Sequence, residues 1–469
     1  MAIELSNIIF TDQADVVPAS GVEQILNTGI ANTLAGDDII NGESGNSIPG
    51  VEVPAPNGGV VNTGTLNTDG GNDRLTGIYN DQTNNSFNGY GIYNVKGIID
   101  TGDDNDILTG ILDTQNQNLL YGIYNENSII NTGDGDDTII SINNITNAPS
   151  TSLMRGIYNV SSTIDTGSGN DIITGNGAWG IENYLGTFNT GDGSDTITGI
   201  GPDFGGIFNS GTFNTGDSND IITGIGKGGD GITASSTSSI DTGDGNDIIT
   251  AIGNYYILYN LGTINTGNGD DSIIADIAEK NGSLPLYISI NSGTIDTGNG
   301  NDSIIFQAGL YNGGGVFLGD GNDSLLADAG PLYPALMNED VIETGDGDDI
   351  ITSTGVIDNE GVFSEGVINM GNGKDSLIAE GGFEGSGNVF LGNGKDYLKG
   401  FGSGNFDGGN GQDTLELTSG TYTIGISSAG VNFTKNSIIM NTSDFEKLIA
   451  GGTTYNFSSL TNGKTIFVA

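Results

Sequence analysis

Apolar side chains recur along this chain in short runs in which every second residue faces the same way. Three kinds of run follow one another: one like Asn-Asp-x-Ile-Ile-Thr, then Gly-Ile-Tyr-Asn, then Gly-Thr-Ile-Asp-Thr-Gly. An alternation with a period of two turns one face of a strand inward. The pattern therefore predicts repeated coils of three short β-strands, an all-β chain.

A six-residue glycine turn sets the register of these coils. Thr242-Gly243-Asp244-Gly245-Asn246-Asp247 is a well-formed copy. Consecutive turns are 17 to 35 residues apart, which fits one turn per coil. We expect a right-handed parallel β-helix, or β-roll-like solenoid, of about fifteen coils. The turns end, from first to last, at the register aspartates Asp38, Asp73, Asp106, Asp137, Asp171, Asp195, Asp220, Asp247, Asp271, Asp302, Asp323, Asp349, Asp375, Asp396 and Asp413.

Interruptions of the period suggest the domain organisation. Residues 1–31 precede the repeats and are expected to form an N-terminal cap strand region, and residues 32–413 the solenoid. Proline-containing stretches at 42–61 and 327–341 read as loop excursions. From Thr414 the glycine turns stop and alternating apolar residues begin, so residues 414–469 are expected to form the β-rich cap that an open-ended solenoid needs.

The fourth position of the Gly-Ile-Tyr-Asn run is expected to place an asparagine column inside the coils. Such asparagines satisfy turn groups far more often than they bind ligands. We therefore predict a stacked amide ladder of Asn94, Asn125, Asn159, Asn183 and Asn209.

Composition narrows the partners. The chain has 82 glycines, 59 acidic and 11 basic residues, and a formal net charge of −48. Nucleic acid and anionic membranes are therefore poor partners, and no apolar run approaches the ~18 residues of a membrane span. The absence of cysteine and histidine excludes disulfides and removes the commonest zinc ligands and general base. A hydrophobic content of 35% argues against disorder.

The turn itself suggests a calcium site. Glycine allows positive φ and lets backbone carbonyls converge without a Cβ clash. Carbonyls and one carboxylate form a hard oxygen cage that suits Ca²⁺, whereas Mg²⁺ demands tighter octahedral geometry. The alternative is that each aspartate merely caps a tight turn, but its recurrence in fifteen registered turns favours metal binding.

These turns resemble the Gly-Gly-x-Gly-x-Asp-x-U-x nonapeptide (U, a bulky apolar residue) of the repeats-in-toxin, or haemolysin-type, calcium-binding family. The resemblance implies Ca²⁺ between the turns of neighbouring coils, with aspartate carboxylates and glycine carbonyls as ligands. The implied metal residues are Gly133, Gly135, Asp137, Gly167, Gly169, Asp171, Gly191, Gly193, Asp195, Asp220, Gly243, Gly245, Asp247, Gly267, Gly269, Asp271, Gly298, Gly300, Asp302, Gly319, Gly321, Asp323, Gly345, Gly347, Asp349, Gly371, Gly373, Asp375, Gly392, Gly394, Asp396 and Asp413.

The chain departs from that family in two ways. The family has two calcium turns per coil, whereas here one alternates with the Gly-Ile-Tyr-Asn half, so we expect a single row of up to about fourteen ions. These would offset about 28 of the 48 negative charges. Leu34, Asp69, Asp104 and Ser218 replace turn glycines, so we expect the N-terminal sites to be weak or empty.

The C-terminal segment, including 406–415 and 445–449, resembles the end of cyanobacterial members of that family. Those members are exported by type I systems through an uncleaved C-terminal signal. The resemblance implies a secreted protein and fits the lack of a visible signal peptide at the N-terminus.

Three functions remain open. The first is a structural protein of the cell surface, such as a filament, sheath, surface layer or matrix, because the repeat leaves no room for a separate catalytic domain. Residues 8–10 and 465–468 are candidate strands for end-to-end self-assembly. The second is a binding module: an adhesin for cell-surface polysaccharide, or a threonine-lined ice-binding face. The third, a polysaccharide-modifying enzyme, is disfavoured because histidine is absent and arginine is limited to Arg74 and Arg155.

Overall fold

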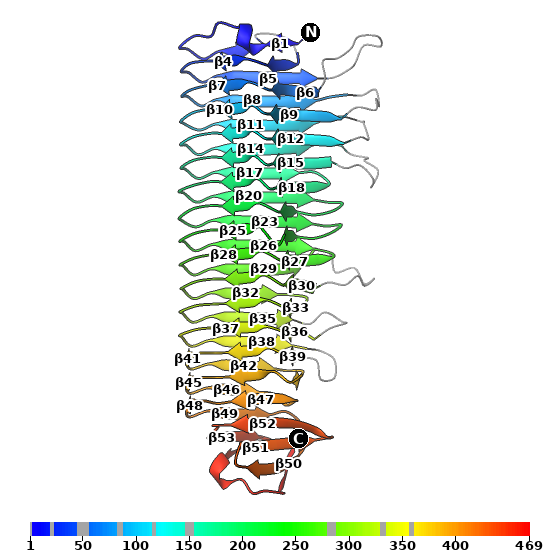
Figure 1. Ribbon diagram of the computed structural model, residues 1–469, viewed down its shortest axis with the longest axis vertical. Helices are drawn as coiled ribbons and strands as arrows, with labels where there is room; N and C mark the ends of the chain where they lie inside the picture. The colour runs from blue at the N-terminus through cyan, green and yellow to red at the C-terminus, as the bar shows by residue number, and fades with distance from the viewer. Residues whose placement is uncertain are drawn as a thin grey trace. The chain divides into compact units, whose positions relative to one another are not determined.

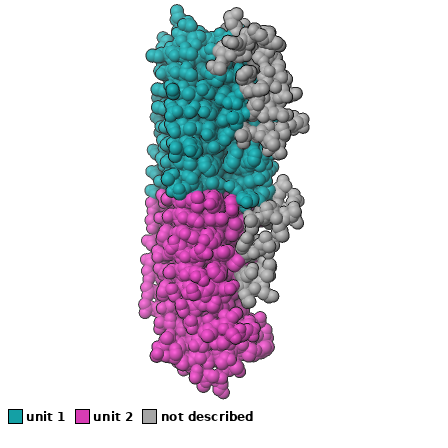
Figure 2. Space-filling model, turned by 45° about the vertical axis from the view of Figure 1, so that its right-hand side comes forward, with its two compact units in different colours: residues 1–244, 248–255, 278–280 teal, residues 245–247, 256–277, 281–469 magenta. Residues whose placement is uncertain are grey.

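The computed structural model describes residues 2–18, 23–44, 56–81, 88–114, 119–145, 154–278, 288–328, 334–355 and 361–469. In this part of the chain almost all regular structure is β-strand, with two single-turn 3-10 helices, η1 (Leu5–Asn7) and η2 (Phe457–Ser459). No described helix is long and apolar enough to cross a lipid bilayer. The chain divides into two compact units, unit 1 (residues 1–244, 248–255 and 278–280) and unit 2 (245–247, 256–277 and 281–469) (Figure 2).

Unit 1 consists of coils whose strands stack into three parallel sheets, which we name A, B and C (Figure 1). Sheet A contains β1 (Ile3–Glu4), β3 (Ile25–Asn27), β6 (Asn57–Asn62), β9 (Gly89–Val95), β12 (Leu120–Glu126), β15 (Met154–Val160), β18 (Trp179–Tyr184), β21 (Ile207–Asn209) and β24 (Ile232–Ala234). Sheet B contains β2 (Val16–Val17), β5 (Ile39–Ser44), β8 (Arg74–Tyr79), β11 (Ile107–Leu112), β14 (Thr138–Asn143), β17 (Ile172–Asn176), β20 (Thr196–Gly201), β23 (Ile221–Gly226) and β26 (Ile248–Gly253). Sheet C contains β4 (Ile30–Asn32), β7 (Thr65–Asn67), β10 (Ile98–Asp100), β13 (Ile129–Asn131), β16 (Thr163–Asp165), β19 (Thr187–Asn189), β22 (Thr212–Asn214) and β25 (Ser239–Asp241).

Unit 2 repeats the same three sheets. Sheet A contains β27 (Tyr256–Asn260), β30 (Ile288–Asn291), β33 (Leu310–Asn312), β36 (Leu336–Asn338), β39 (Val362–Ser364) and β43 (Phe383–Glu384). Sheet B contains β29 (Ser272–Ile277), β32 (Ser303–Phe306), β35 (Ser324–Asp328), β38 (Ile350–Thr354), β42 (Ser376–Ala379), β46 (Tyr397–Lys399), β49 (Thr414–Leu417) and β53 (Lys447–Ala450). Sheet C contains β28 (Thr263–Asn265), β31 (Thr294–Asp296), β34 (Gly315–Phe317), β37 (Val341–Glu343), β40 (Val367–Asn369), β44 (Asn388–Phe390), β47 (Gly404–Asp407) and β52 (Ile438–Ser443).

The last part of unit 2 adds antiparallel strands to two of these sheets. Sheet C continues into β51 (Gly430–Lys435), β50 (Gly420–Ser427) and β55 (Thr465–Val468), and β54 (Thr453–Asn456) pairs with β53. The glycine turns of three late coils also pair with one another, as β41 (Asn372–Gly373), β45 (Asn393–Gly394) and β48 (Asn410–Gly411). The alternation predicted after Thr414 is thus a set of mostly antiparallel strands.

Each coil contributes three short strands, and equivalent residues of successive coils pair in register. Ile197 of β20, for example, lies opposite Ile222 of β23. Both side chains are fully buried, whereas the residues on either side of them point outward. The inward side chains therefore stack into a continuous core within each unit. The structure confirms the predicted all-β parallel solenoid with three strands per coil.

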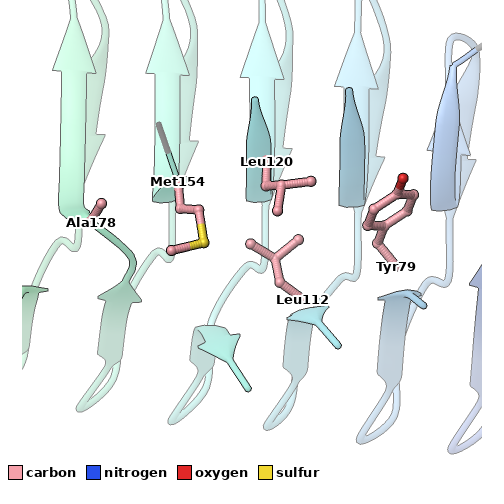
Figure 3. Packing of buried hydrophobic residues seen from close by; sticks show 5 residues of the cluster. All are labelled: Tyr79, Leu112, Leu120, Met154 and Ala178. Carbon is pink, nitrogen blue, oxygen red and sulfur yellow. The ribbon is translucent and has the colours of Figure 1, made fainter. Parts of the chain in front are cut away.

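Larger side chains fill part of the core of unit 1 where sheets A and B meet. Tyr79 and Leu112 end two strands of sheet B, and Leu120 and Met154 begin two strands of sheet A. With Ala178 they form one buried cluster (Figure 3). Their side chains thereby close the corner of the coil that precedes each sheet A strand.

The amide ladder is also confirmed. The side-chain Nδ2 of Asn94 donates to Oδ1 of Asn125 at 2.8 Å, and Asn125 donates in the same way to Asn159 at 2.9 Å. The ladder continues through Asn183 and Asn209. All of these side chains are fully buried, so each amide satisfies its neighbour in place of water.

Some boundaries expected from the sequence were wrong. The first expected excursion, residues 42–61, is shorter than predicted, because residues 42–44 belong to strand β5 and residues 57–61 to strand β6. Residues 45–55 lie outside the described residues. The second expected excursion likewise loses 327–328, 336–338 and 341 to strands, and 329–333 lies outside the described residues. Residues 8–10 form no strand: Ile9 is exposed and Phe10 is buried.

Candidate metal-binding turns

The glycine turns share one backbone conformation along both units. The first glycine of the turn has φ between +77° and +97° in well-formed copies such as Gly191 (+77°) and Gly345 (+97°). Leu34 (+67°) and Asp69 (+59°) adopt the same left-handed conformation where they replace it. Asp104 (+83°) and Ser218 (+102°) also have positive φ at the second glycine position. The departures that we expected to weaken the N-terminal turns therefore leave the path of the chain intact.

Close stacking of successive coils explains why glycine is preferred there. A Cβ atom added to Gly193 would lie only 1.6 Å from the carbonyl oxygen of Gly169 in the preceding coil. At Gly394, an added Cβ would also come within 2.9 Å of Oδ1 of Asp396. The second glycine thus keeps the space beside the register carboxylate open.

The register aspartates point inward and form one ladder in each unit. In unit 1 the backbone N–H of Asp106 donates to Oδ1 of Asp137 at 2.7 Å, and the same bond links each register aspartate from Asp38 to Asp220. In unit 2 the bond recurs from Asp247 to Asp413, at 2.8 to 2.9 Å. One oxygen of each accepting carboxylate is therefore satisfied by a charge-assisted hydrogen bond.

The second oxygen of these carboxylates is different. Oδ2 is buried and has no hydrogen-bond partner in Asp38, Asp73, Asp106, Asp137, Asp171, Asp195, Asp271, Asp302, Asp323, Asp349, Asp375, Asp396 and Asp413. In several turns a threonine hydroxyl lies nearby. Hydrogen bonding to Thr132 lowers the pKa of Asp137 and so offsets part of the rise caused by burial, although Oδ2 and this hydroxyl do not meet the geometry of a normal hydrogen bond. At the turns that end in Asp323, Asp375 and Asp396, the threonine position holds Leu318, Met370 and Leu391, which offer no hydroxyl.

Burial makes these carboxylates costly to ionise in the absence of a counter-charge. Desolvation raises the pKa of Asp106 to about 8 and the pKa values of Asp137 and Asp195 to about 7. Neighbouring register aspartates add to the rise by charge repulsion. No described lysine or arginine forms an ion pair with these aspartates; Arg155 pairs with Glu182 on sheet A. A bound cation would remove this penalty.

The donor set fits a hard cation. No described point is surrounded by three or more acidic side chains, so an ion between two turns would have at most the carboxylates of two neighbouring coils. Backbone carbonyls would have to complete its shell, and such an all-oxygen shell is typical of Ca²⁺. Some of the expected carbonyl donors already accept a backbone hydrogen bond: Gly371 accepts from Asn393 at 2.9 Å, and Gly392 from Asn410 at 2.8 Å. A carbonyl has two lone pairs, so these oxygens retain a position for a ligand.

The structure adds residues that the proposed ligand set omitted. Asp38, Asp73 and Asp106 have the same buried ladder geometry as the expected ligands. At the far end of the unit 2 ladder, Oε2 of Glu446 accepts the backbone N–H of Asp413 at 2.7 Å. Glu446 follows Asp413 by 33 residues, a normal spacing for this repeat, so the spacing could have revealed it.

Comparisons with known proteins give limited information. No protein-family model and no curated protein matches the chain. Among solved structures, the chain is similar to the X-ray crystal structure of a hyperactive, Ca²⁺-dependent, beta-helical antifreeze protein from an Antarctic bacterium, with a TM-score of 0.38 and 17% sequence identity. The match covers 85% of this chain and 84% of that one. A likeness this distant carries no argument about ligands or activity.

Proposed function

We propose that this chain is a secreted calcium-binding protein with a structural role at the cell surface, as part of a filament, sheath, surface layer or matrix. The observation that carries the proposal is the column of buried register aspartates, thirteen of which have one carboxylate oxygen with no hydrogen-bond partner. Thirteen such groups cannot be left ionised and unpaired without a large loss of stability.

Calcium ions would bridge the turns of neighbouring coils. The register carboxylates and the carbonyls of the turn glycines would hold the ions, and each ion would supply two positive charges against the carboxylate column. Because the ligands come from residues far apart in the sequence, binding and folding would be coupled. This proposal gives the chain no catalytic role.

Thermal unfolding followed by circular dichroism tests the calcium role. We expect the melting temperature to fall by more than 10 °C when calcium is removed with a chelator, and to recover when excess calcium is restored. Magnesium at the same concentration serves as the control and should restore little of the loss. An equal melting temperature in calcium and in chelator would remove the basis of the proposal.

Electron microscopy of the purified chain tests the structural role. We expect ordered filaments or sheets in calcium and none in chelator. Particles that stay single at high concentration in calcium would contradict this role.

The proposal also includes export through a signal in residues 414–469.

A groove in unit 2 supports a second candidate function, binding to a cell-surface polysaccharide. The groove has a volume of about 370 Å³, and its lining includes the exposed ring of Phe390 on β44 and Asp407 on β47. Beside them, Asn441 donates to Asn405 at 3.2 Å, and Asn405 donates to Asn388 at 3.1 Å. An aromatic ring next to a row of amides offers stacking and hydrogen bonds to sugar rings and hydroxyls.

Co-sedimentation with insoluble polysaccharides tests this candidate. Phe390→Ala should lower the bound fraction several-fold, whereas Phe317→Ala on β34 is the matched control at the equivalent strand position and should leave it unchanged. Equal binding of both variants and the unaltered chain would exclude the groove as the binding site.

A further inference from the structure

We propose that two copies of this chain associate face to face through part of the outer surface of sheet B in unit 1. We name this surface the uncharged face and define it by the outward residues of β11, β14, β17, β20, β23 and β26. They are Ile107, Thr109, Ile111, Thr138, Ile140, Ile142, Ile172, Thr174, Asn176, Thr196, Thr198, Ile200, Ile221, Thr223, Ile225, Ile248, Thr250 and Ile252.

The residues of this face form straight columns across neighbouring strands. Thr174 pairs with Thr198, and Thr198 in turn with Thr223. Beside them, Ile200 lies opposite Ile225, and Ile225 opposite Ile252. Such columns of β-branched side chains make a flat, regular surface that can pack against another sheet.

The absence of charge distinguishes this face from the other surfaces of unit 1. None of its eighteen positions holds an ionisable side chain, although the chain has 59 acidic residues. The outer face of sheet C in the same coils holds Asp100, Asp165 and Asp241. The outer face of sheet A holds the ion pair of Arg155 with Glu182. In a chain with a net charge of −48, a face that contacts only solvent would be expected to carry some of the acidic residues.

The isoleucines of the uncharged face remain accessible. Ile172, Ile221 and Ile248 are 44%, 39% and 38% exposed, although each packs between neighbouring coils. Contiguous apolar patches of several hundred Å² are rare on monomeric proteins and mark interaction sites. Six strands spaced ~4.8 Å apart, each ~20 Å long, give about 600 Å² per copy. Two copies would bury about 1,200 Å², the lower bound for a specific interface.

A second copy is the occupant that best matches this face. Two sheets of the same chain can pack about 10 Å apart with a two-fold axis between them, so that the surface is complementary to itself. The net negative charge of each copy opposes association, and contact through an uncharged surface adds no direct pairs of like charges to that repulsion. We therefore expect association to strengthen as salt screens that repulsion.

Analytical ultracentrifugation of the full chain in calcium tests this proposal. We expect a monomer–dimer equilibrium that shifts toward the dimer between 50 mM and 500 mM NaCl. Thr198→Lys places a charge at the centre of the uncharged face and should weaken dimerisation at least tenfold. Thr187→Lys is the matched control, because it lies in an equivalent threonine column, between Thr163 and Thr212 on sheet C, and should leave the dimer unchanged.

A second variant keeps the test informative if Thr198→Lys does not fold. Ile225→Ser removes apolar surface without adding charge and should weaken the dimer several-fold, while circular dichroism checks that all variants keep their β-structure. A monomeric unaltered chain at every salt concentration overturns the proposal, as does equal dimerisation of Thr198→Lys and Thr187→Lys. A monomer that instead adsorbs to a polysaccharide surface through this face also overturns it. The calcium dependence of melting is measured separately, so a failure here leaves the calcium account standing.

Discussion

At the scale of single residues, the two oxygens of a register carboxylate have different surroundings. Oδ1 of Asp137 accepts the backbone N–H of Asp106, whereas Oδ2 is buried without a partner. Capping of a tight turn explains why Oδ1 has a partner. It does not explain why Oδ2 is buried without one, because a buried charged oxygen without a partner lowers stability. The neighbouring Asp136 lies in the same turn but is exposed, and it accepts hydrogen bonds from Asn170.

Asp137→Asn should therefore have opposite effects in two buffers. In calcium we expect a loss of about 1–3 kcal/mol, because the variant loses a charged ligand. In chelator the variant should be as stable as the unaltered chain or more stable, because a buried carboxylate is gone. Asp136→Asn is the control and should change stability by less than about 0.5 kcal/mol in either buffer. Denaturant unfolding measures both, and the same loss in both buffers would contradict a metal role for Asp137.

Leu34 offers a test of the turn conformation alone. Its φ of +67° is unfavourable for a residue with a Cβ atom. Leu34→Gly should relieve this strain and stabilise the chain by up to about 1 kcal/mol, less whatever the partly buried side chain contributes. Leu34→Ala keeps the strain and loses the side chain, so it should be the least stable of the three in thermal unfolding. An alanine variant more stable than the glycine variant would show that strain is negligible at this turn.

At the scale of elements, the ladders hold neighbouring coils together more specifically than apolar packing does. Asn125 donates to Asn159 and also to the carbonyl of Thr163, and it accepts from Asn94. Its replacement would leave groups on two neighbouring coils without a partner in a dry interior. By contrast, Asn131 on the outer face of sheet C makes a hydrogen bond to Asp100 that water can replace.

Asn125→Ala should accordingly cost about 3 kcal/mol or more, while Asn131→Ala should cost less than about 1 kcal/mol. Hydrogen exchange of the backbone amides near β12 and β15 measures whether the loss is local to the two coils. If both variants lose equal stability, the buried ladder does not contribute as described.

How far the sequence could anticipate these elements depends on which residues it constrains. The turn glycines and register aspartates recur so often that the coil was predictable from their spacing. The period-two alternation predicted its three strands, and the Gly-Ile-Tyr-Asn run predicted the Asn125 ladder. The strand status of residues 42–44 was not, because the prolines that follow suggested a loop. The end of the ladder at Glu446 was missed because glutamate replaces aspartate after an irregular segment. The uncharged face could be recognised only from the pairing register of the strands, because the sequence alone does not show which threonines and isoleucines of neighbouring coils lie side by side.

At the scale of the whole molecule, the large negative charge and the buried carboxylates make stability depend on pH. Burial raises the pKa of Asp106 to about 8 and that of Asp195 to about 7, above the ordinary aspartate value of 3.8. Between about pH 4 and pH 8 the folded, calcium-free chain retains protons on these carboxylates that the unfolded chain releases. Its stability is therefore highest below about pH 4 and falls as the pH rises toward 8.

We accordingly expect the melting temperature in calcium-free buffer to fall between pH 4 and pH 8. With saturating calcium the trend should reverse, because protons then compete with the metal for the same oxygens. Scanning calorimetry across this range measures both curves. A calcium-free chain that becomes more stable as the pH rises would contradict the burial of unpaired carboxylates.

The most direct test of the account counts the metal. Thirteen intervals separate consecutive register aspartates within the two units. Elemental analysis of the chain after equilibrium dialysis against calcium should find more than ten tightly held ions per molecule, and about one fewer in Asp137→Asn. A chain that retains no calcium, yet stays folded, would show that something else offsets the charge of these aspartates.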